Sequence, residues 1–256
     1  MASIEKEHAE TGGFSSECEE IEIESGLYQD FEIVDVPGLV EGEKNAKQRK
    51  AVERIVELYV RNPRFAIVLL KEAHQSKENS HGARRIHDLC TSPKAIASNQ
   101  PPRMDYQEHM ITIQTKFDIF MQQYTNGTQA NQEIAAQLTN FERCYFVNMV
   151  FDGFSMKDES YARNRQYLLG LPELEKEKVN EWIRSINQKA APGAVGKFER
   201  FKDDYRLLIG ITTVREQIQR FWLECKKHDK ATAAIILLVI LICIAKTVKS
   251  GTSTSG

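Results

Sequence analysis

Residues 31–40, FEIVDVPGLV, join a short apolar strand to an acid and a glycine turn. The apolar run Phe31–Val34 ends at Asp35, and Pro37 and Gly38 follow at once. In a nucleotide-binding α/β protein, a carboxylate and a free backbone N–H at the edge of a sheet lie where a metal-bound phosphate is held. Asp-x-Pro-Gly is also ordinary turn chemistry, and taken alone it favours a simple turn.

Residues 111–118, ITIQTKFD, form a second apolar segment, and it ends in the polar motif Thr115-Lys116-Phe117-Asp118. A T-K-x-D motif after a buried strand is typical of the guanine-binding loop of GTPases. The aspartate accepts hydrogen bonds from the ring N–H and the exocyclic amine of guanine, and the lysine stem lies along the base. Adenine offers no matching pair of donors, so it would leave the buried acid unpaired. Together the two motifs favour a GTPase fold.

Strand and helix patterns alternate around these motifs. The run FAIVLL is continuously apolar, which is typical of a parallel strand buried on both faces. The patterns predict helices over 41–61, 80–90 and 132–143, strands over 65–70 and 144–150, and a proline-rich loop over 91–106. This order predicts an α/β fold with a mostly parallel sheet and helices around it.

Three further segments extend this pattern. Residues 20–24, EIEIE, alternate acid and isoleucine, and we expect them to pair with the strand at 31–34 as an antiparallel hairpin. Residues 161–186 favour a helix that breaks near 170–172, and another helix is expected to begin at Thr213 with a capping box to Glu216. The apolar stripe of that last helix would pack on the core or on a partner helix.

Composition and charge limit the possible functions. The chain has 256 residues, of which 41% are hydrophobic and 27% charged, which suits one domain with a full core or slightly more. A net charge of −2 gives no argument for a nucleic-acid partner. The five cysteines are scattered without a C-x-x-C motif, so neither a disulfide framework nor a zinc site follows and a reducing compartment fits best.

The sequence resembles the dynamin superfamily of large GTPases over roughly residues 18–225. The resemblance is carried, in order, by EIEIESGLYQDFEIVDVPGLV, RFAIVLLKEA, GARRIHDL, ITIQTKFDIF, FVNMV, ARNRQYL and GITTVREQIQRFW. It implies a partial G domain over 1–209, with a three-layer sheet like that of P-loop GTPases whose N-terminal part is missing. It also implies a helix over 210–229 that leaves this domain towards a bundle or stalk.

The resemblance also implies a nucleotide site. The implied GTP-binding residues are Asp35, Gly38, Thr115, Lys116, Asp118 and Asn148. Asp35 would hold Mg²⁺ through water, and the Gly38 N–H would sense the γ-phosphate. For Asn148, contact with the base and a purely local hydrogen bond to backbone are both open. The implied partners are guanine nucleotide, membrane lipid and a second copy bound through the G domain or a helix bundle.

One departure from the family affects the expected activity. The sequence contains no G-x-x-x-x-G-K-[ST] motif, whose backbone N–H groups and lysine supply most phosphate binding. Asn148-Met149 also lacks the arginine that usually follows in the family. The chain is therefore expected to bind GTP very weakly. It is either part of a GTP-hydrolysing protein that remodels membranes, or a non-catalytic, membrane-anchored interaction module.

The C-terminal run 231–245, ATAAIILLVILICIA, is almost wholly apolar. As a helix it would span about 22 Å, short of the roughly 30 Å hydrocarbon core, and flanking lysines could close part of the gap. We expect a transmembrane helix over 231–248, a polar tail over 249–256 and a cytoplasmic body held at the membrane. The alternative is a helix buried in a soluble bundle.

Overall fold

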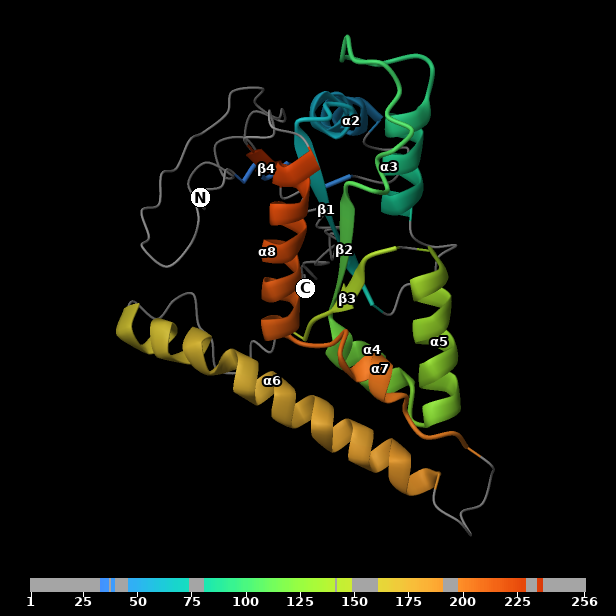
Figure 1. Ribbon diagram of the computed structural model, residues 1–256, viewed down its shortest axis with the longest axis vertical. Coiled ribbons are helices and arrows are strands. Elements are labelled where there is room, and N and C mark those ends of the chain that lie inside the picture. The colour runs from blue at the N-terminus through green and yellow to red at the C-terminus, as the bar shows by residue number, and fades with distance from the viewer. Residues whose placement is uncertain are drawn as a thin grey trace, which may run out of the picture.

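The computed structural model describes residues 33–36, 38–39, 46–73, 81–140, 142–148, 161–190, 198–228 and 234–236. Its strands are β1 (Phe65–Glu72), β2 (Met110–Thr115), β3 (Cys144–Phe146) and β4 (Ala234–Ile236). They form one sheet in the order β3-β2-β1-β4, and each neighbouring pair is parallel (Figure 1). The predicted α/β fold is confirmed at this level.

Helices separate the strands along the chain, as parallel connections require. The described helices are α2 (Ala46–Val60), α3 (His81–Thr91), α4 (Phe117–Gln123), α5 (Gly127–Asn140), α6 (Tyr161–Lys189), α7 (Asp203–Arg206) and α8 (Ile211–His228). The predicted strands and helices between residues 41 and 150 are found with shifted ends. The predicted loop over 91–106 holds neither helix nor strand after Thr91.

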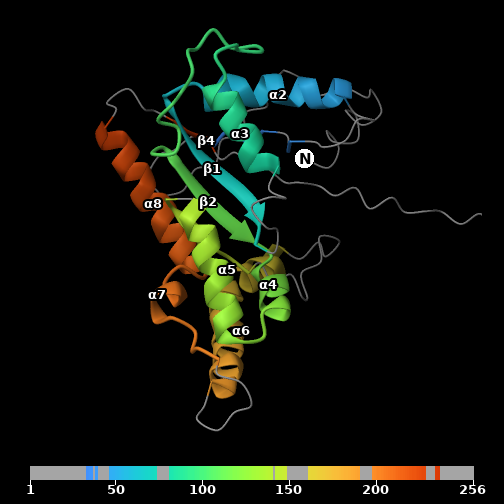
Figure 2. The same ribbon diagram turned by 90° about the vertical axis from the view of Figure 1, so that its right-hand side faces the viewer.

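Both faces of the sheet are covered, because alternate side chains of β1 and β2 enter two different cores. On one face Ile67 and Leu69 of β1 pack with buried residues of α2 and α3. On the other, Val68 of β1 and Ile111 of β2 pack with α8. Figure 2 shows the strands between α8 and the pair α2 and α3. Burial on both sides explains the uninterrupted apolar run of β1.

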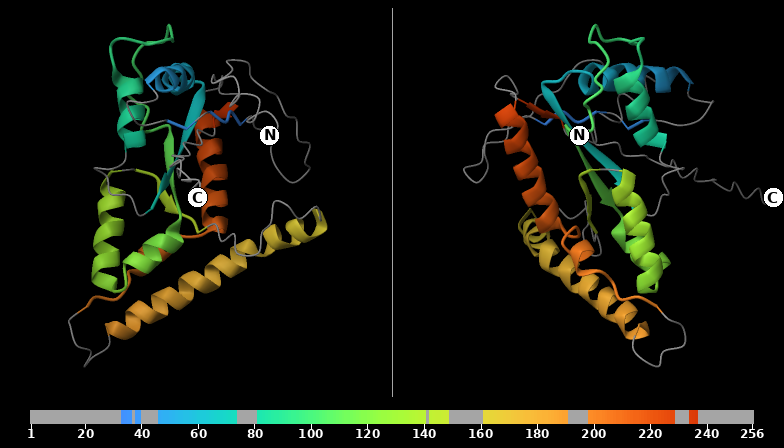
Figure 3. Two further views of the ribbon diagram at one scale, coloured as in Figure 1. Left: turned by 180° about the vertical axis from the view of Figure 1, so that it is seen from behind. Right: turned by 45° about the vertical axis from the view of Figure 1, so that its right-hand side comes forward.

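An aromatic cluster fixes the helices beyond the carboxyl ends of the strands. The rings of Phe117 and Phe120 in α4 stack with their centroids 4.9 Å apart, and Trp182 of α6 meets the Phe117 ring edge-on at 5.7 Å. The Trp182 indole N–H donates to the Tyr124 carbonyl at 3.1 Å. Figure 3 shows α6 running across this end of the molecule. The cluster thereby holds the start of α4 in a fixed position.

Two predictions about helices are wrong. The break expected near 170–172 does not occur, since α6 runs through Pro172. A proline removes one helical hydrogen bond, and the exposed turn at Leu168 leaves the freed carbonyl within reach of water. The helix expected to begin at Thr213 begins at Ile211, so Thr213 lies inside it and forms no capping box. Its hydroxyl instead donates to the Ile209 carbonyl at 3.5 Å.

The predicted transmembrane helix over 231–248, and with it membrane association through the C-terminal segment, is also wrong. Within the part of the chain that the structure describes, no helix combines enough length with enough apolar character to cross a bilayer. Ala234–Ile236 instead forms β4, which pairs with β1 from Phe65 to Ile67. The edge of β1 offers unpaired backbone groups, and a β-branched apolar segment can satisfy them. The predicted hairpin of 20–24 with 31–34 falls largely outside the described residues.

Candidate functional site

The carboxyl ends of β2 and β3 bring two predicted binding segments together. The turn Thr115–Asp118 follows β2, and Asn148 lies two residues after β3. The Val147 N–H donates to the Gln114 carbonyl at 2.8 Å, and the Phe117 N–H donates to the Val147 carbonyl at 3.3 Å. The pairing of β2 with β3 therefore continues beyond the sheet, which places Asn148 against the turn.

The turn has an unusual backbone at Lys116. This residue has φ 56° and ψ 41°, the left-handed conformation that side chains other than glycine rarely adopt. It is the only described residue besides glycine with a positive φ. Its ammonium pairs with the carboxylate of Glu72 at the end of β1, and the Thr115 hydroxyl donates to the Lys71 carbonyl at 3.2 Å. Contacts with β1 thus hold a backbone conformation that is locally unfavourable.

Asn148 has a buried and unpaired side-chain amide. The residue is 1% exposed, and neither its amide nitrogen nor its amide oxygen has a hydrogen-bond partner. Leaving a buried polar group unpaired costs roughly 1–3 kcal/mol per group. Its backbone N–H donates to Glu175 Oε1 at 2.5 Å, so the backbone donor is paired while the side-chain amide is not.

Asp118 lies half-buried in the first turn of α4, next to the same cluster. The two neighbours of Asp118 in this helix, Phe117 and Phe120, are fully buried in the aromatic cluster. The helix therefore cannot rotate without breaking that core. The structure thus groups Thr115, Lys116 and Asp118 with Asn148 at a single edge of the sheet.

Asp35 and Gly38 lie elsewhere. Val36 and Leu39, their neighbours, are buried in the same core as α2, and in Figures 1 and 2 this segment is nearer α2 than α4. Asp35 is exposed, and partial burial of its carboxyl raises its pKa above the ordinary value. Among the described residues no hydrogen bond or ion pair joins either residue to the Thr115–Asp118 turn. Their predicted role at a phosphate stays a prediction.

The described residues offer little for Mg²⁺. No group of three or more histidine, cysteine, aspartate or glutamate side chains in the described ranges is arranged to hold a metal ion.

Two carboxylates near the site were missed by sequence reasoning. Glu72 follows Lys71 at the end of an apolar strand, and adjacent charges at that place could have signalled a role at the sheet edge. Glu175 lies in the middle of α6 among other charged residues, and nothing in the local sequence separates it from them. Yet Glu175 is 1% exposed, whereas Glu173 two residues earlier is largely exposed.

The chain was compared with protein-family models, with curated proteins and with solved structures, and no match was found in any of them.

Proposed function

We propose that this chain carries the base-recognition half of a guanine-nucleotide site of the dynamin-like type. The observation that carries the proposal is the unpaired amide of Asn148, which is buried beside the T-K-F-D turn. A buried amide without a partner, next to a motif suited to guanine, is the arrangement expected where a purine edge supplies the missing hydrogen bonds.

The chemistry of the proposed contacts selects guanine. The Asp118 carboxylate accepts from the ring N–H and the exocyclic amine, and the Asn148 amide donates to the exocyclic oxygen. The stem of Lys116 covers one face of the base while Glu72 holds its ammonium. Adenine has no pair of donors for the Asp118 carboxylate, so it would leave that half-buried acid without its two hydrogen bonds.

Hydrolysis of GTP is the wider activity that the family resemblance suggests. It needs phosphate-binding groups of the G-x-x-x-x-G-K-[ST] type, which are not in this sequence. Base recognition alone gives an affinity in the millimolar range, because a few hydrogen bonds must offset the entropy of binding. We therefore expect no measurable heat of GTP binding by calorimetry at micromolar concentrations.

Saturation-transfer NMR with GMP and AMP at millimolar concentration tests the proposal. We expect transfer to the guanine protons of GMP and several-fold less transfer to AMP. Asp118→Asn replaces an acceptor by a donor at the base edge. The substitution should therefore weaken the binding of GMP and favour the binding of xanthosine monophosphate, whose C2 oxygen accepts a hydrogen bond where the guanine amine donates one.

The matched control is Asp204→Asn, which makes the same change on the exposed surface of α7. This variant should bind GMP as the wild type does. Equal signals from GMP and AMP in the wild type, or no change of preference in Asp118→Asn, would show that the turn does not read guanine.

A further inference from the structure

Glu175 joins two strand ends that lie far from it in sequence. The segment 208–210 runs beside β3: the Phe146 N–H donates to the Leu208 carbonyl at 2.9 Å, and the Gly210 N–H donates to the Phe146 carbonyl at 2.9 Å. This ladder stops at Gly210, whose φ of +124° turns the chain into α8. The next backbone donors along the two segments are the N–H groups of Asn148 and Ile211.

Both of these donors are bound by the Glu175 carboxylate. Its Oε1 accepts from the Asn148 N–H and its Oε2 from the Ile211 N–H, each at 2.5 Å. The Ile211 N–H is one of the first N–H groups of α8, which no carbonyl within that helix can satisfy. A carboxylate offers two acceptor oxygens, whereas an amide offers one, so the acid gives each donor an oxygen of its own.

The carboxylate has a structural role, because it ties the start of α8 to the chain after β3. Burial raises the pKa of the Glu175 carboxyl, and the two N–H groups oppose that effect. What the contact does achieve is to fix the backbone of Asn148, the residue whose side-chain amide is buried without a partner. The direction of that amide follows from the backbone that Glu175 holds.

We infer that Glu175 is a positioning residue for purine recognition: it holds Asn148 so that the amide is presented to the exocyclic oxygen of a 6-oxopurine. This inference rests on the proposed function, and it adds a residue outside the motifs that supply the predicted binding residues. The ligand class follows from the amide together with Asp118: a 6-oxopurine supplies an acceptor for the amide N–H and two donors for the carboxylate, whereas a 6-aminopurine offers the carboxylate no such pair of donors.

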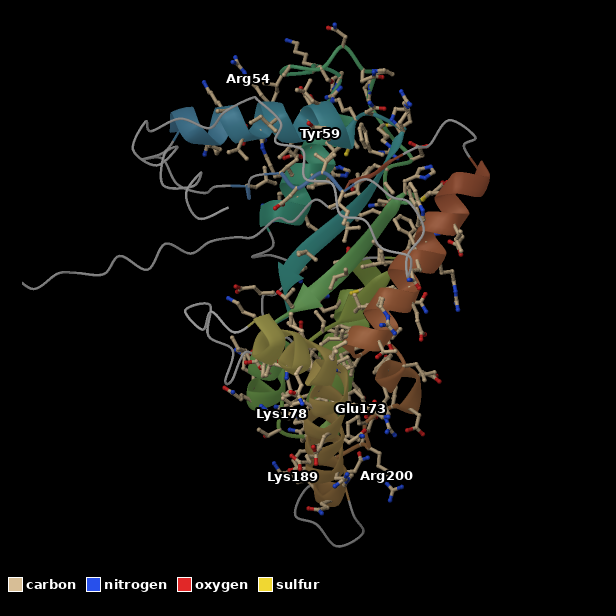
Figure 4. The ribbon with its side chains drawn as sticks, turned by 90° about the vertical axis from the view of Figure 1, so that its left-hand side faces the viewer. Arg54, Tyr59, Glu173, Lys178, Lys189 and Arg200 are labelled. Carbon is tan, nitrogen blue, oxygen red and sulfur yellow. The ribbon has the colours of Figure 1, made fainter. Side chains whose placement is uncertain are left out.

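The first test is amide hydrogen exchange of the Glu175→Gln variant in the absence of a ligand. The variant keeps the side-chain volume and removes one acceptor, so amide hydrogen exchange at Asn148 or Ile211 should accelerate by about tenfold or more. Glu173→Gln, the same change on the exposed side of α6, should leave both rates unchanged (Figure 4). Unchanged exchange at both amides in folded Glu175→Gln would overturn the inference.

The second measurement is the preference for GMP over AMP by saturation-transfer NMR. Glu175→Gln should lose most of that preference, by about tenfold in relative affinity, while Glu173→Gln keeps it. If Glu175 had a structural role alone, the substitution would lower the folded fraction and weaken the binding of GMP and AMP equally. A preference that persists in folded Glu175→Gln overturns the positioning role only, whereas a wild type without any preference overturns the proposed function as well.

Glu175→Asp provides a second variant if Glu175→Gln does not fold. It retains the charge but is one methylene shorter, so its carboxylate cannot reach both donors. We expect the same faster exchange at one of the two amides and the same loss of preference for GMP. Wild-type exchange and preference in this variant would count against the inference.

Discussion

Two buried polar regions of this protein differ in how fully their groups are paired. Between α2 and the loop that follows α3, the Glu57 carboxylate accepts from the N–H groups of Ile96, Ala97 and Ser98. Arg61 beside it pairs with Glu57 at 3.2 Å and donates to the Leu89 carbonyl at 2.7 Å. At the carboxyl edge of the sheet, by contrast, the Asn148 amide has no partner.

Buried hydroxyls without a partner also occur at Ser98 and Thr112, so a missing partner alone does not mark a functional site. Asn148 differs from them because it lies beside the Thr115–Asp118 turn. Glu57 and Arg61 are 0% and 1% exposed, and their contacts tie a long loop without regular structure to α2, so their pairing serves the fold. A 320 Å³ cavity opens beside Glu57, but its carboxylate is already saturated by these contacts. Asn148 is buried as deeply, yet its pairing is incomplete, and the missing partner is what the proposed ligand supplies.

The largest expected change in stability follows from a substitution in the region of Glu57 and Arg61. Arg61→Leu removes a buried guanidinium and leaves the Glu57 carboxylate and the loop carbonyls without it. We expect a loss of about 3–5 kcal/mol in the free energy of unfolding, measured by urea denaturation. Arg54→Leu makes the same change on the exposed side of α2 and should stay within about 0.5 kcal/mol (Figure 4). Similar losses in both variants would contradict this account.

The next effect concerns Lys71, which is 3% exposed between β1, β2 and α5 and donates to Gln137 at 2.8 Å. Burial lowers the pKa of its ammonium to about 8. Between pH 8 and the ordinary lysine value the unfolded chain binds more protons than the folded one. Lys71 therefore adds stability as pH rises through this window, by up to about 1.4 kcal/mol per pH unit.

Lys71→Met removes this contribution while keeping the side-chain volume. The stability of the wild type relative to Lys71→Met should rise between pH 8 and pH 10, as measured by urea denaturation of both proteins at each pH. Taking the difference cancels the cysteines and tyrosines, whose ionisation acts in the opposite direction over this range. A difference that stays flat would show that Lys71 keeps an ordinary pKa.

A smaller change, in this case a gain in stability, is expected from a substitution at Asn148. Asn148→Leu replaces the unpaired amide by an apolar group of similar size, so the free energy of unfolding should rise by about 1 kcal/mol. The preference for GMP over AMP should be lost in the same protein. A clear loss of stability would mean that the amide is paired in solution, and the comparison with Arg61 would then fail.

The smallest effect on stability is expected at Lys116. Lys116→Gly relieves the left-handed backbone, by about 1 kcal/mol. It also loses the ion pair between the half-exposed Lys116 ammonium and the buried Glu72 carboxylate, and it raises the conformational entropy of the unfolded chain. The net change in thermal stability should be below about 1 kcal/mol. Saturation transfer to GMP should nevertheless fall, because the lysine stem no longer covers the base.

The sequence alone predicted the elements with a strong local signal. The continuous apolar run of β1 and the strand before T-K-F-D each require burial on both faces, which fixed the α/β class and the parallel pairing. The predictions from sequence were wrong where local signals compete. A proline did not break α6, a Thr and Glu pair did not cap α8, and the apolar segment at 234–236 paired with a strand instead of forming a helix.

By itself, then, the sequence determined which residues are candidates for a purine site, because motif chemistry depends on residue type and spacing. Only the tertiary structure decided which of them meet: it placed Lys116, Asp118 and Asn148 at one edge and brought in Glu72 and Glu175 from distant elements. The physical reason is that a buried polar group is satisfied by whatever the folded chain brings within hydrogen-bond distance, and separation along the sequence does not limit that choice.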